Sequence, residues 1–182
     1  MVREFQNQRG FSLTELMLTV TVAATLLAIG VPVLKDVTEG SKLNGAAREL
    51  EREFQSARLR AVSSNRSLRV RLNCPAAGYY RTVEVLGTAA DTASNRCLLS
   101  AYPFPADADL TTRPNYDGPT RVLPNGATVA DAIVEFRSDG TAYQVVANVA
   151  QTIATPLSVT VTRNNKSKVM TINGSGKIQL QQ

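Results

Sequence analysis

The sequence predicts an α+β fold in which one long N-terminal helix, membrane-spanning in its first half, packs on a largely antiparallel β-sheet domain. The prediction rests on a 24-residue apolar run, on an amphipathic stripe that follows it, and on period-two alternation beyond. The 182 residues suffice for a membrane helix and one modest domain. We divide the chain into a leader, a membrane helix, an amphipathic continuation of that helix and a β-rich domain, at residues 1–10, 11–34, 35–64 and 65–182.

The apolar run over residues 11–34 carries Glu15 as its only charge. About 20 helical residues cross the hydrocarbon core of a bilayer, and Arg3 and Arg9 ahead of the run favour a cytoplasmic N-terminus. A cleaved secretory signal needs a shorter apolar core and a small-residue cleavage site, which the downstream flank lacks. A buried core helix would show a polar face, whereas the threonines here are scattered. The run therefore predicts a retained membrane helix.

The junction ahead of this run carries a family resemblance. Gly10 is followed by Phe11, and Glu15 is the fifth residue counted from Phe11. This arrangement resembles the class III signal of type IV pilins and type II secretion pseudopilins. The resemblance implies that prepilin peptidase cuts after Gly10 and methylates the new amine of Phe11. Pro32 falls where many members of the family have a helix-kinking proline.

Glu15 needs a physical explanation, because a carboxylate inside a membrane segment costs roughly 2.5–3.5 kcal/mol on insertion scales. Cleavage after Gly10 would leave an ammonium group on Phe11. That ammonium on one subunit can neutralise Glu15 of a neighbour, and a paired buried charge is tolerated where a lone one is not. We therefore interpret Glu15 as an assembly residue.

Beyond the membrane segment, apolar residues spaced by three and four predict an amphipathic helix with a narrow apolar stripe. The stripe comprises Leu43, Ala47, Leu50, Phe54, Ala57 and Ala61. Gly40 and Gly45 each cost up to ~1 kcal/mol of helix propensity. We expect residues 32–45 to be the weak part of one long helix, able to bend or melt when a filament forms.

The rest of the chain reads as strands and turns. Leu68, Val70 and Leu72 alternate with arginines and predict one strand, Val83 and Val85 indicate a second, and a third strand is expected at residues 98–102. The proline-rich stretch 103–125 is expected to be mostly loop. The later strands are expected at residues 132–137 and 141–146 around a Ser-Asp-Gly turn, at 157–161 and 168–173 around Asn164-Asn165, and at 178–180 after Gly174-Ser175-Gly176.

Three motifs narrow the resemblance to the GspH/FimT branch of minor pilins and pseudopilins. They are Leu50-x3-Phe54-x2-Ala57-Arg58, Val134-Glu135-Phe136-Arg137-x2-Gly140 and Val169-x2-Ile172-x3-Gly176-Lys177-Ile178. The resemblance implies a single-pass inner-membrane protein with a periplasmic domain that later joins a pilus or a type II secretion pseudopilus. Its implied partners are prepilin peptidase, other pilins or pseudopilins, and the inner membrane before assembly.

The chain has two cysteines and no histidine. Cys74 and Cys97 flank a polar, turn-rich segment, and in an oxidising compartment we expect them to pair. Such a loop closure contributes on the order of 3–4 kcal/mol in the chain-entropy model. Two cysteines without a histidine make a poor metal site, so no metal is predicted.

No motif in the sequence supports catalysis. The chain lacks a nucleophile motif and a paired-carboxylate spacing, and Asp107 and Asp109 read as a solvated surface pair. We therefore predict neither catalytic residues nor a cofactor, and expect a structural protein rather than an enzyme.

DNA binding in natural transformation is the alternative function. The formal net charge is +5, and no acidic residue follows Asp139, whereas Arg163, Lys166, Lys168 and Lys177 are all basic. Basic patches attract phosphates without base specificity. A second basic run, Arg58, Arg60, Arg66, Arg69 and Arg71, has a competing interpretation as the solvated face of a sheet.

In the FimT group, DNA uptake is associated with a Gly-Arg-x-Arg motif near the C-terminus. The matching residues here are Gly176-Lys177-Ile178-Gln179, with one lysine in place of two arginines. Lysine holds a phosphate as a point charge but lacks the bidentate fork of arginine. This departure weakens the DNA interpretation.

Overall fold

The computed structural model describes residues 12–104 and 116–181. They fall into two compact units, an N-terminal one that ends at Glu39 and a second one, Gly40–Gln182. Gly10 and Phe11 of the junction, and the Asp107–Asp109 pair, lie outside the described residues.

The one α-helix of the described residues, α1, spans Leu13–Ser64 and includes Pro32. Its N-terminal part is long and apolar enough to cross a membrane, with a mean hydropathy of 2.2 over 18 residues, none of which is buried. The scattered threonines do not interrupt it, because their hydroxyls donate to backbone carbonyls three or four residues earlier. Residues 32–45 are helical in the structure. Their expected bending in a filament stays a prediction.

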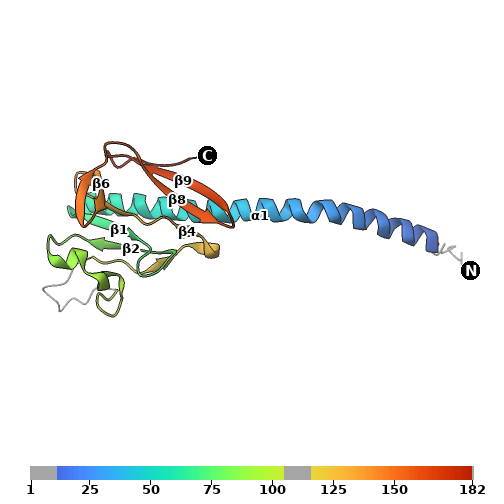
Figure 1. The fold of residues 1–182 in the computed structure, drawn as a ribbon, viewed down its shortest axis with the longest axis horizontal. Helices are drawn as coiled ribbons and strands as arrows, with labels where there is room; N and C mark the ends of the chain where they lie inside the picture. Colours follow the sequence, from blue (N-terminus) through green and yellow to red (C-terminus); the bar gives the residue numbers. More distant parts are fainter. Residues whose placement is uncertain (1–11, 105–115, 182) are drawn as a thin grey trace, which may run out of the picture. The chain divides into compact units, whose positions relative to one another are not determined.

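In the second unit, α1 buries one stripe of small and apolar side chains. The stripe consists of Leu43, Ala46, Ala47, Leu50, Phe54, Ala57 and Ala61. All six residues predicted from the spacing are buried, and Ala46 joins them. The ring of Phe54 packs edge to face on the ring of Phe136 from β5, with the ring centroids 6.2 Å apart. The amphipathic pattern thus predicted the helix face that packs on the strands (Figure 1).

Two antiparallel sheets form the rest of this unit (Figure 1). The six-stranded sheet has the order β3-β2-β1-β5-β6-β7. Its strands are β1 (Leu68–Leu72), β2 (Tyr79–Glu84), β3 (Arg121–Val122), β5 (Ile133–Phe136), β6 (Ala142–Val146) and β7 (Val149–Thr152). The four-stranded sheet has the order β10-β9-β8-β4. Its strands are β4 (Thr128–Val129), β8 (Leu157–Arg163), β9 (Lys166–Ile172) and β10 (Ile178–Leu180).

The predicted hairpins form where the turn residues place them. β5 pairs with β6 around Gly140, whose φ of 82° is in the region that favours glycine. β8 pairs with β9 along its whole length around Asn164 and Asn165, which take φ values of 45° and 62°. Two positive φ values in a two-residue loop match the twist of the strands. Both hairpin predictions are confirmed.

The sequence patterns did not predict three short strands, β3, β4 and β7, and one strand that they did predict is absent from the structure. β3 and β4 have two residues each, too few to show alternation, and β7 follows β6 through Ala147 and Asn148. The strand expected at residues 98–102 is wrong. The amides of Ala101 and Tyr102 both bond to the carbonyl of Leu98, which curls the chain into a turn just after the 3₁₀ helix Ser94–Cys97.

The core lies between the stripe of α1 and the inner faces of both sheets. It includes alternate residues of β1 and β9, namely Leu68, Val70, Leu72, Met170 and Ile172. On β1 the intervening residues, Arg69 and Arg71, therefore point to the opposite face of the six-stranded sheet. That face is covered by a layer built from the segments that precede β3, described below.

Candidate functional site

The N-terminal segment of α1 presents a continuous apolar surface. Glu15 lies in the first turn of the helix and is exposed, as are Leu13, Leu16 and Leu18 around it. Leu13 is 74% exposed. Contiguous apolar patches of this kind mark lipid-facing or protein-facing surfaces. Glu15 is thus a single carboxylate on a helix surface suited to lipid or to neighbouring helices.

The four basic residues proposed for DNA binding do not form one patch. Arg163 and Lys166 lie opposite each other at the closed end of the β8–β9 hairpin. The Arg163 guanidinium also donates to the carbonyl of Asn125 over 2.6 Å. Lys168 and Lys177 instead line two adjoining clefts along α1, which share Gln55 and form one groove. The sequence grouping therefore splits into a turn and a groove.

The second basic run is engaged within the protein. Arg58 donates to the carbonyls of Gly140 and Ser175 at 3.0 and 3.1 Å. Arg66 pairs with Glu84, and Arg60 stacks over the ring of Tyr116 at 4.0 Å. These contacts remove the run from any simple phosphate-binding patch.

The competing interpretation of that run as the solvated face of a sheet is wrong for Arg69, which is buried, and for Arg71, which is half-buried. Arg69 is only 8% exposed and forms an ion pair with Glu135 at 2.9 Å. Burial, followed by the nearby charges of Arg69 and Arg96, lowers the pKa of Arg71. A second layer over this sheet face excludes the solvent that the alternation had suggested.

This second layer is organised by Arg81, a wholly buried residue of β2. Its guanidinium donates to the carbonyls of Gly118, Arg96 and Tyr102 over 2.8, 2.9 and 2.7 Å. The three carbonyls come from separate stretches of chain. A single side chain thus ties these stretches to the sheet, which satisfies carbonyls that burial would otherwise leave unpaired.

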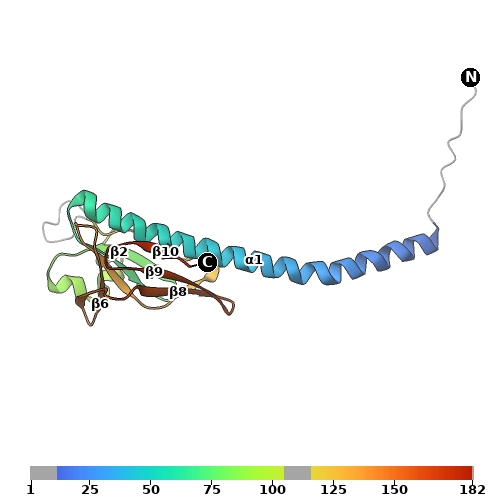
Figure 2. The same ribbon diagram turned by 90° about the horizontal axis from the view of Figure 1, so that it is seen from above.

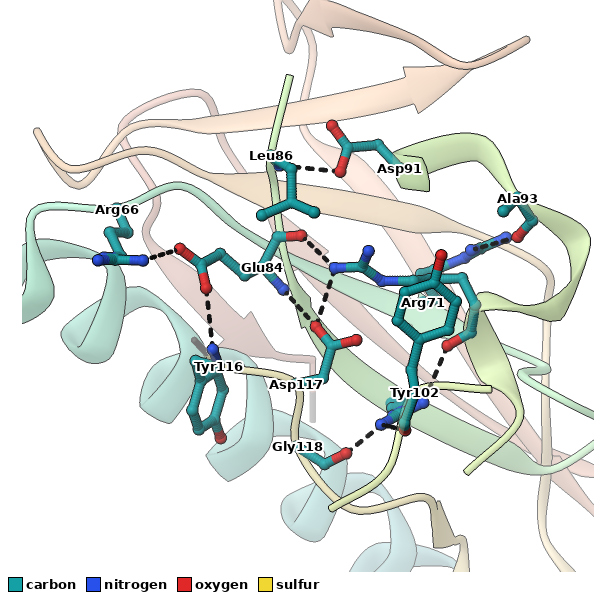
Figure 3. A network of polar contacts seen from close by, with 12 residues as sticks. Arg66, Arg71, Glu84, Leu86, Asp91, Ala93, Tyr102, Tyr116, Asp117 and Gly118 are labelled. Carbon is teal, nitrogen blue, oxygen red and sulfur yellow. Dashed lines mark hydrogen bonds and ion pairs between the residues drawn. The ribbon is translucent and has the colours of Figure 1, made fainter. Parts of the chain in front are cut away.

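Arg96 forms the second centre of the layer. It is wholly buried, and its guanidinium donates to the Glu84 carbonyl at 2.7 Å and to Asp117 Oδ1 at 3.0 Å; Figure 3 labels Glu84 and Asp117, the two acceptor residues. The same carboxylate accepts the Glu84 amide at 3.0 Å, and the Tyr102 ring lies 4.6 Å from the guanidinium carbon. Burial raises the pKa of Asp117, and the positive charge of Arg96 opposes that rise.

Cys74 and Cys97 close this layer covalently, as predicted. They form a disulfide with Cα atoms 5.3 Å apart. Cys97 follows Arg96 directly, so the bond fixes the segment that carries the buried guanidinium. The sequence predicted the disulfide but not the charge network, because Arg81, Arg96 and Asp117 show no motif or periodic spacing.

The layer has no catalytic arrangement among its described residues. Its arginines donate to carbonyls and carboxylates, and these contacts position backbone rather than a reactive group. In the described part of the chain, no group of three metal-ligating His, Cys, Asp or Glu side chains occurs. The network acts as a structural clamp.

Two family models match the chain. The model described as "Type II transport protein GspH" matches residues 46–176, and the one described as "Prokaryotic N-terminal methylation motif" matches residues 5–31. The second match spans Gly10, Phe11 and Glu15. A comparison with curated proteins finds no match.

Two solved structures are similar to the chain in fold. The type IV minor pilin FimU of Pseudomonas aeruginosa shares 20% identity over 80% of this chain and 92% of its own, with a TM-score of 0.49. The minor pseudopilin EpsH of the Vibrio cholerae type 2 secretion system shares 12% identity over 74% of this chain and 92% of its own, with a TM-score of 0.42.

The family assignment rests on the two family models, which together cover the apolar helix and most of the domain. The first of them alone spans more than half of the chain. The observed fold, one long helix on antiparallel sheets, agrees with them. The chain therefore belongs to the GspH family of type II transport proteins, and it carries a prokaryotic N-terminal methylation motif.

Proposed function

We propose that the chain is made as a precursor, cut by prepilin peptidase between Gly10 and Phe11, and methylated on the new amine. The N-terminal part of α1 then anchors the mature protein in the inner membrane, with its N-terminus cytoplasmic and its domain periplasmic. It stays there until it enters a pilus or a type II pseudopilus. Its role is structural and involves no catalysis. The observation that carries the proposal is the apolar N-terminal segment of α1, which has no buried residue in its 18-residue apolar window and lies largely within the match to the methylation motif.

Glu15 supplies the assembly contact in this proposal. A carboxylate on a lipid-exposed helix is costly, and the amine of Phe11 from a neighbouring subunit offsets that cost. The exposure of Glu15 leaves it available to a neighbour. Pro32 removes one backbone hydrogen bond from the helix and provides a point of bending during packing.

The test separates processing from assembly. Gly10→Ala is expected to leave an uncut precursor, detected by mass spectrometry of the purified chain. Glu15→Gln is expected to be cut and inserted normally but to be depleted at least tenfold from sheared filaments. Thr19→Ala is the matched control, since it removes a polar group one helical turn further on and should assemble normally. Normal assembly of Glu15→Gln would refute the pairing.

DNA binding at the β8–β9 turn is the second candidate. The observation that favours it is the placement of Arg163 and Lys166 opposite each other at the end of an extended hairpin. A phosphate-driven interaction is strongest at low salt. We expect Arg163→Gln/Lys166→Gln to weaken duplex binding by the full chain in an electrophoretic shift at low salt. An unshifted duplex with the wild-type chain under these conditions would exclude this candidate.

A further inference from the structure

The C-terminal strand β10 lies beside α1 (Figure 2), and side chains of both elements line a groove between them. It consists of two adjoining clefts of about 500 and 260 Å³ that share Gln55. Residues 44–55 of α1 line the first together with Leu180 and Gln181, and residues 55–59 line the second together with residues 176–178. The strand therefore runs antiparallel to the helix along the groove.

The two walls of the groove have similar lengths. Residues 44–59 of α1 span about 22 Å at 1.5 Å per residue. Residues 176–181 span roughly 17 Å at the rise of an extended strand. The groove accordingly has the length of an extended peptide of about six residues.

Cations converge on the first cleft from both walls. Arg48 and Arg52 come from α1, and Lys168 lies on the same face of β9 as the buried Met170, which is the face that packs on the helix. Of the described residues, Glu51 is the one acidic residue that lines either cleft. Like charges that face each other across a cleft repel, and an anionic occupant removes that cost.

Arg48 and Arg52 differ from the other arginines of the described residues. Arg58, Arg66, Arg69, Arg71, Arg81, Arg96, Arg121, Arg137 and Arg163 each donate to a carbonyl or a carboxylate. Arg60 stacks on a tyrosine ring. Within residues 12–104 and 116–181, Arg48 and Arg52 have no such contact. The fold thus uses its other arginines internally and leaves these two available in the groove.

The backbone edge of β10 is also available. β10 is the terminal strand of its sheet and pairs with β9 alone. The Lys177 carbonyl accepts the Asn173 amide, and the Gln181 amide donates to Val169. Since antiparallel pairing alternates, Ile178 and Leu180 direct their amides and carbonyls to the outer edge, where they bond to no other described residue.

We propose that this groove binds an extended acidic peptide segment of a partner protein, which adds a strand to β10 and places its carboxylates against Arg48, Arg52 and Lys168. Three observations favour a peptide over nucleic acid. Among the described residues no aromatic side chain lines either cleft to stack on bases, β10 pairs on one side only, and the outward amides and carbonyls of Ile178 and Leu180 are complementary to a peptide backbone.

The test uses the full chain in neutral detergent at low salt, with the fluorescein-labelled peptide Glu-Val-Glu-Val-Glu-Val and fluorescence polarisation. Arg48→Gln/Arg52→Gln is expected to weaken binding about tenfold. Arg163→Gln/Lys166→Gln is the matched control, because it removes the same charge outside the groove, and it should change binding less than about twofold. Equal thermal unfolding midpoints of both variants will establish that each is folded.

A second comparison tests the backbone pairing without changing the protein. The same peptide N-methylated at every backbone amide cannot donate to a strand edge, and it should bind at least fivefold more weakly. Equal binding of the methylated peptide would overturn strand addition, and equal weakening by the control variant would overturn the groove. A duplex oligonucleotide that displaces the peptide from Arg48 and Arg52 would reassign the groove to nucleic acid. Self-association that Arg48→Gln/Arg52→Gln abolishes would reassign it to a second copy.

Discussion

At the scale of single residues, the arginines of this protein have sharply different roles. Arg81 and Arg96 are wholly buried and organise the layer over the six-stranded sheet. Arg48 and Arg52 lie in a polar cleft. The sequence shows them alike, because a guanidinium has the same formal charge everywhere. Its role follows from the carbonyls and carboxylates that the fold brings to it.

The Arg96–Asp117 pair yields the first stability prediction. Arg96→Met leaves the Asp117 carboxylate buried without its partner, so we expect a loss of about 3–5 kcal/mol in the free energy of unfolding. Arg137→Met is the matched control, since its ion pair with Glu135 is partly exposed, and it should cost about 1 kcal/mol or less. Urea unfolding of the full chain in detergent measures both. Equal losses would show that burial does not set the value of these pairs.

Asp139 yields a pH prediction. The Thr141 hydroxyl, and then the Thr141 amide, donate to its carboxylate and lower its pKa below the ordinary value of 3.8. A depressed pKa stabilises the fold above pH 3.8, and that stabilisation is lost as the pH falls through the folded-state pKa. Thr141→Ala keeps the hydrogen bond from the backbone amide of residue 141 but removes the one from the hydroxyl, so the pKa of Asp139 should rise toward its ordinary value. NMR titration of the carboxyl carbon measures the shift, and an unchanged pKa would contradict the role of the hydroxyl.

At the scale of elements, the turn before β10 depends on a close approach of two glycines. Gly176 has a φ of 75°, and a Cβ there would lie 2.2 Å from the Gly140 carbonyl oxygen and 2.6 Å from Arg58 Nε. The turn between β9 and β10 and the turn of the β5–β6 hairpin thus meet at Arg58, whose guanidinium donates to a carbonyl of each. The family motifs that contain Gly140 and Gly176 converge at this contact.

This contact predicts an asymmetry between two glycines. Gly176→Ala adds a steric clash to the backbone cost and should destabilise the protein by about 3 kcal/mol or more. Gly126→Ala has a similar φ of 68° but meets nothing within 4 Å, so only the backbone cost of about 1–2 kcal/mol applies. Thermal unfolding of the two variants compares them. Equal destabilisation would remove the close approach as the reason for the glycine.

At the scale of the whole molecule, the disulfide cross-links the layer over the six-stranded sheet, whereas the four-stranded sheet contains no disulfide among its described residues. Cys74 and Cys97 are 23 residues apart, and the loop that they close contains both Arg81 and Arg96. β8 and β9 pair over seven residues, without a disulfide within the hairpin. Loss of the bond is therefore expected to act locally.

The corresponding prediction concerns Cys74→Ser/Cys97→Ser. The free energy of unfolding should fall by about 3 kcal/mol, the chain-entropy value for a loop of this length. Amide hydrogen exchange should rise in residues 75–104, while β8 and β9 keep their protection. A uniform rise across both sheets would contradict a local role. Mass spectrometry of proteolytic fragments measures the two regions separately.

How much the sequence predicts depends on the distance over which its information acts. The helix stripe around Leu50 and Phe54 and the turn at Asn164-Asn165 are local patterns, and the structure confirms them. The strand expected at residues 98–102 fails, because a turn bonded to Leu98 is fixed by the layer around it. Arg69 was expected in solvent, yet a distant segment covers it.

The sequence by itself determined the apolar helix, its amphipathic continuation, the hairpins, the cysteine pair and the methylation motif with Glu15. Each depends on periodicity or on spacing within a short stretch. Only the tertiary structure decided that Arg81 and Arg96 are buried, that Gly176 meets Gly140, and that Lys168 faces Arg48 across a groove. These relations join residues far apart in the chain, and packing of the helix on two sheets creates them.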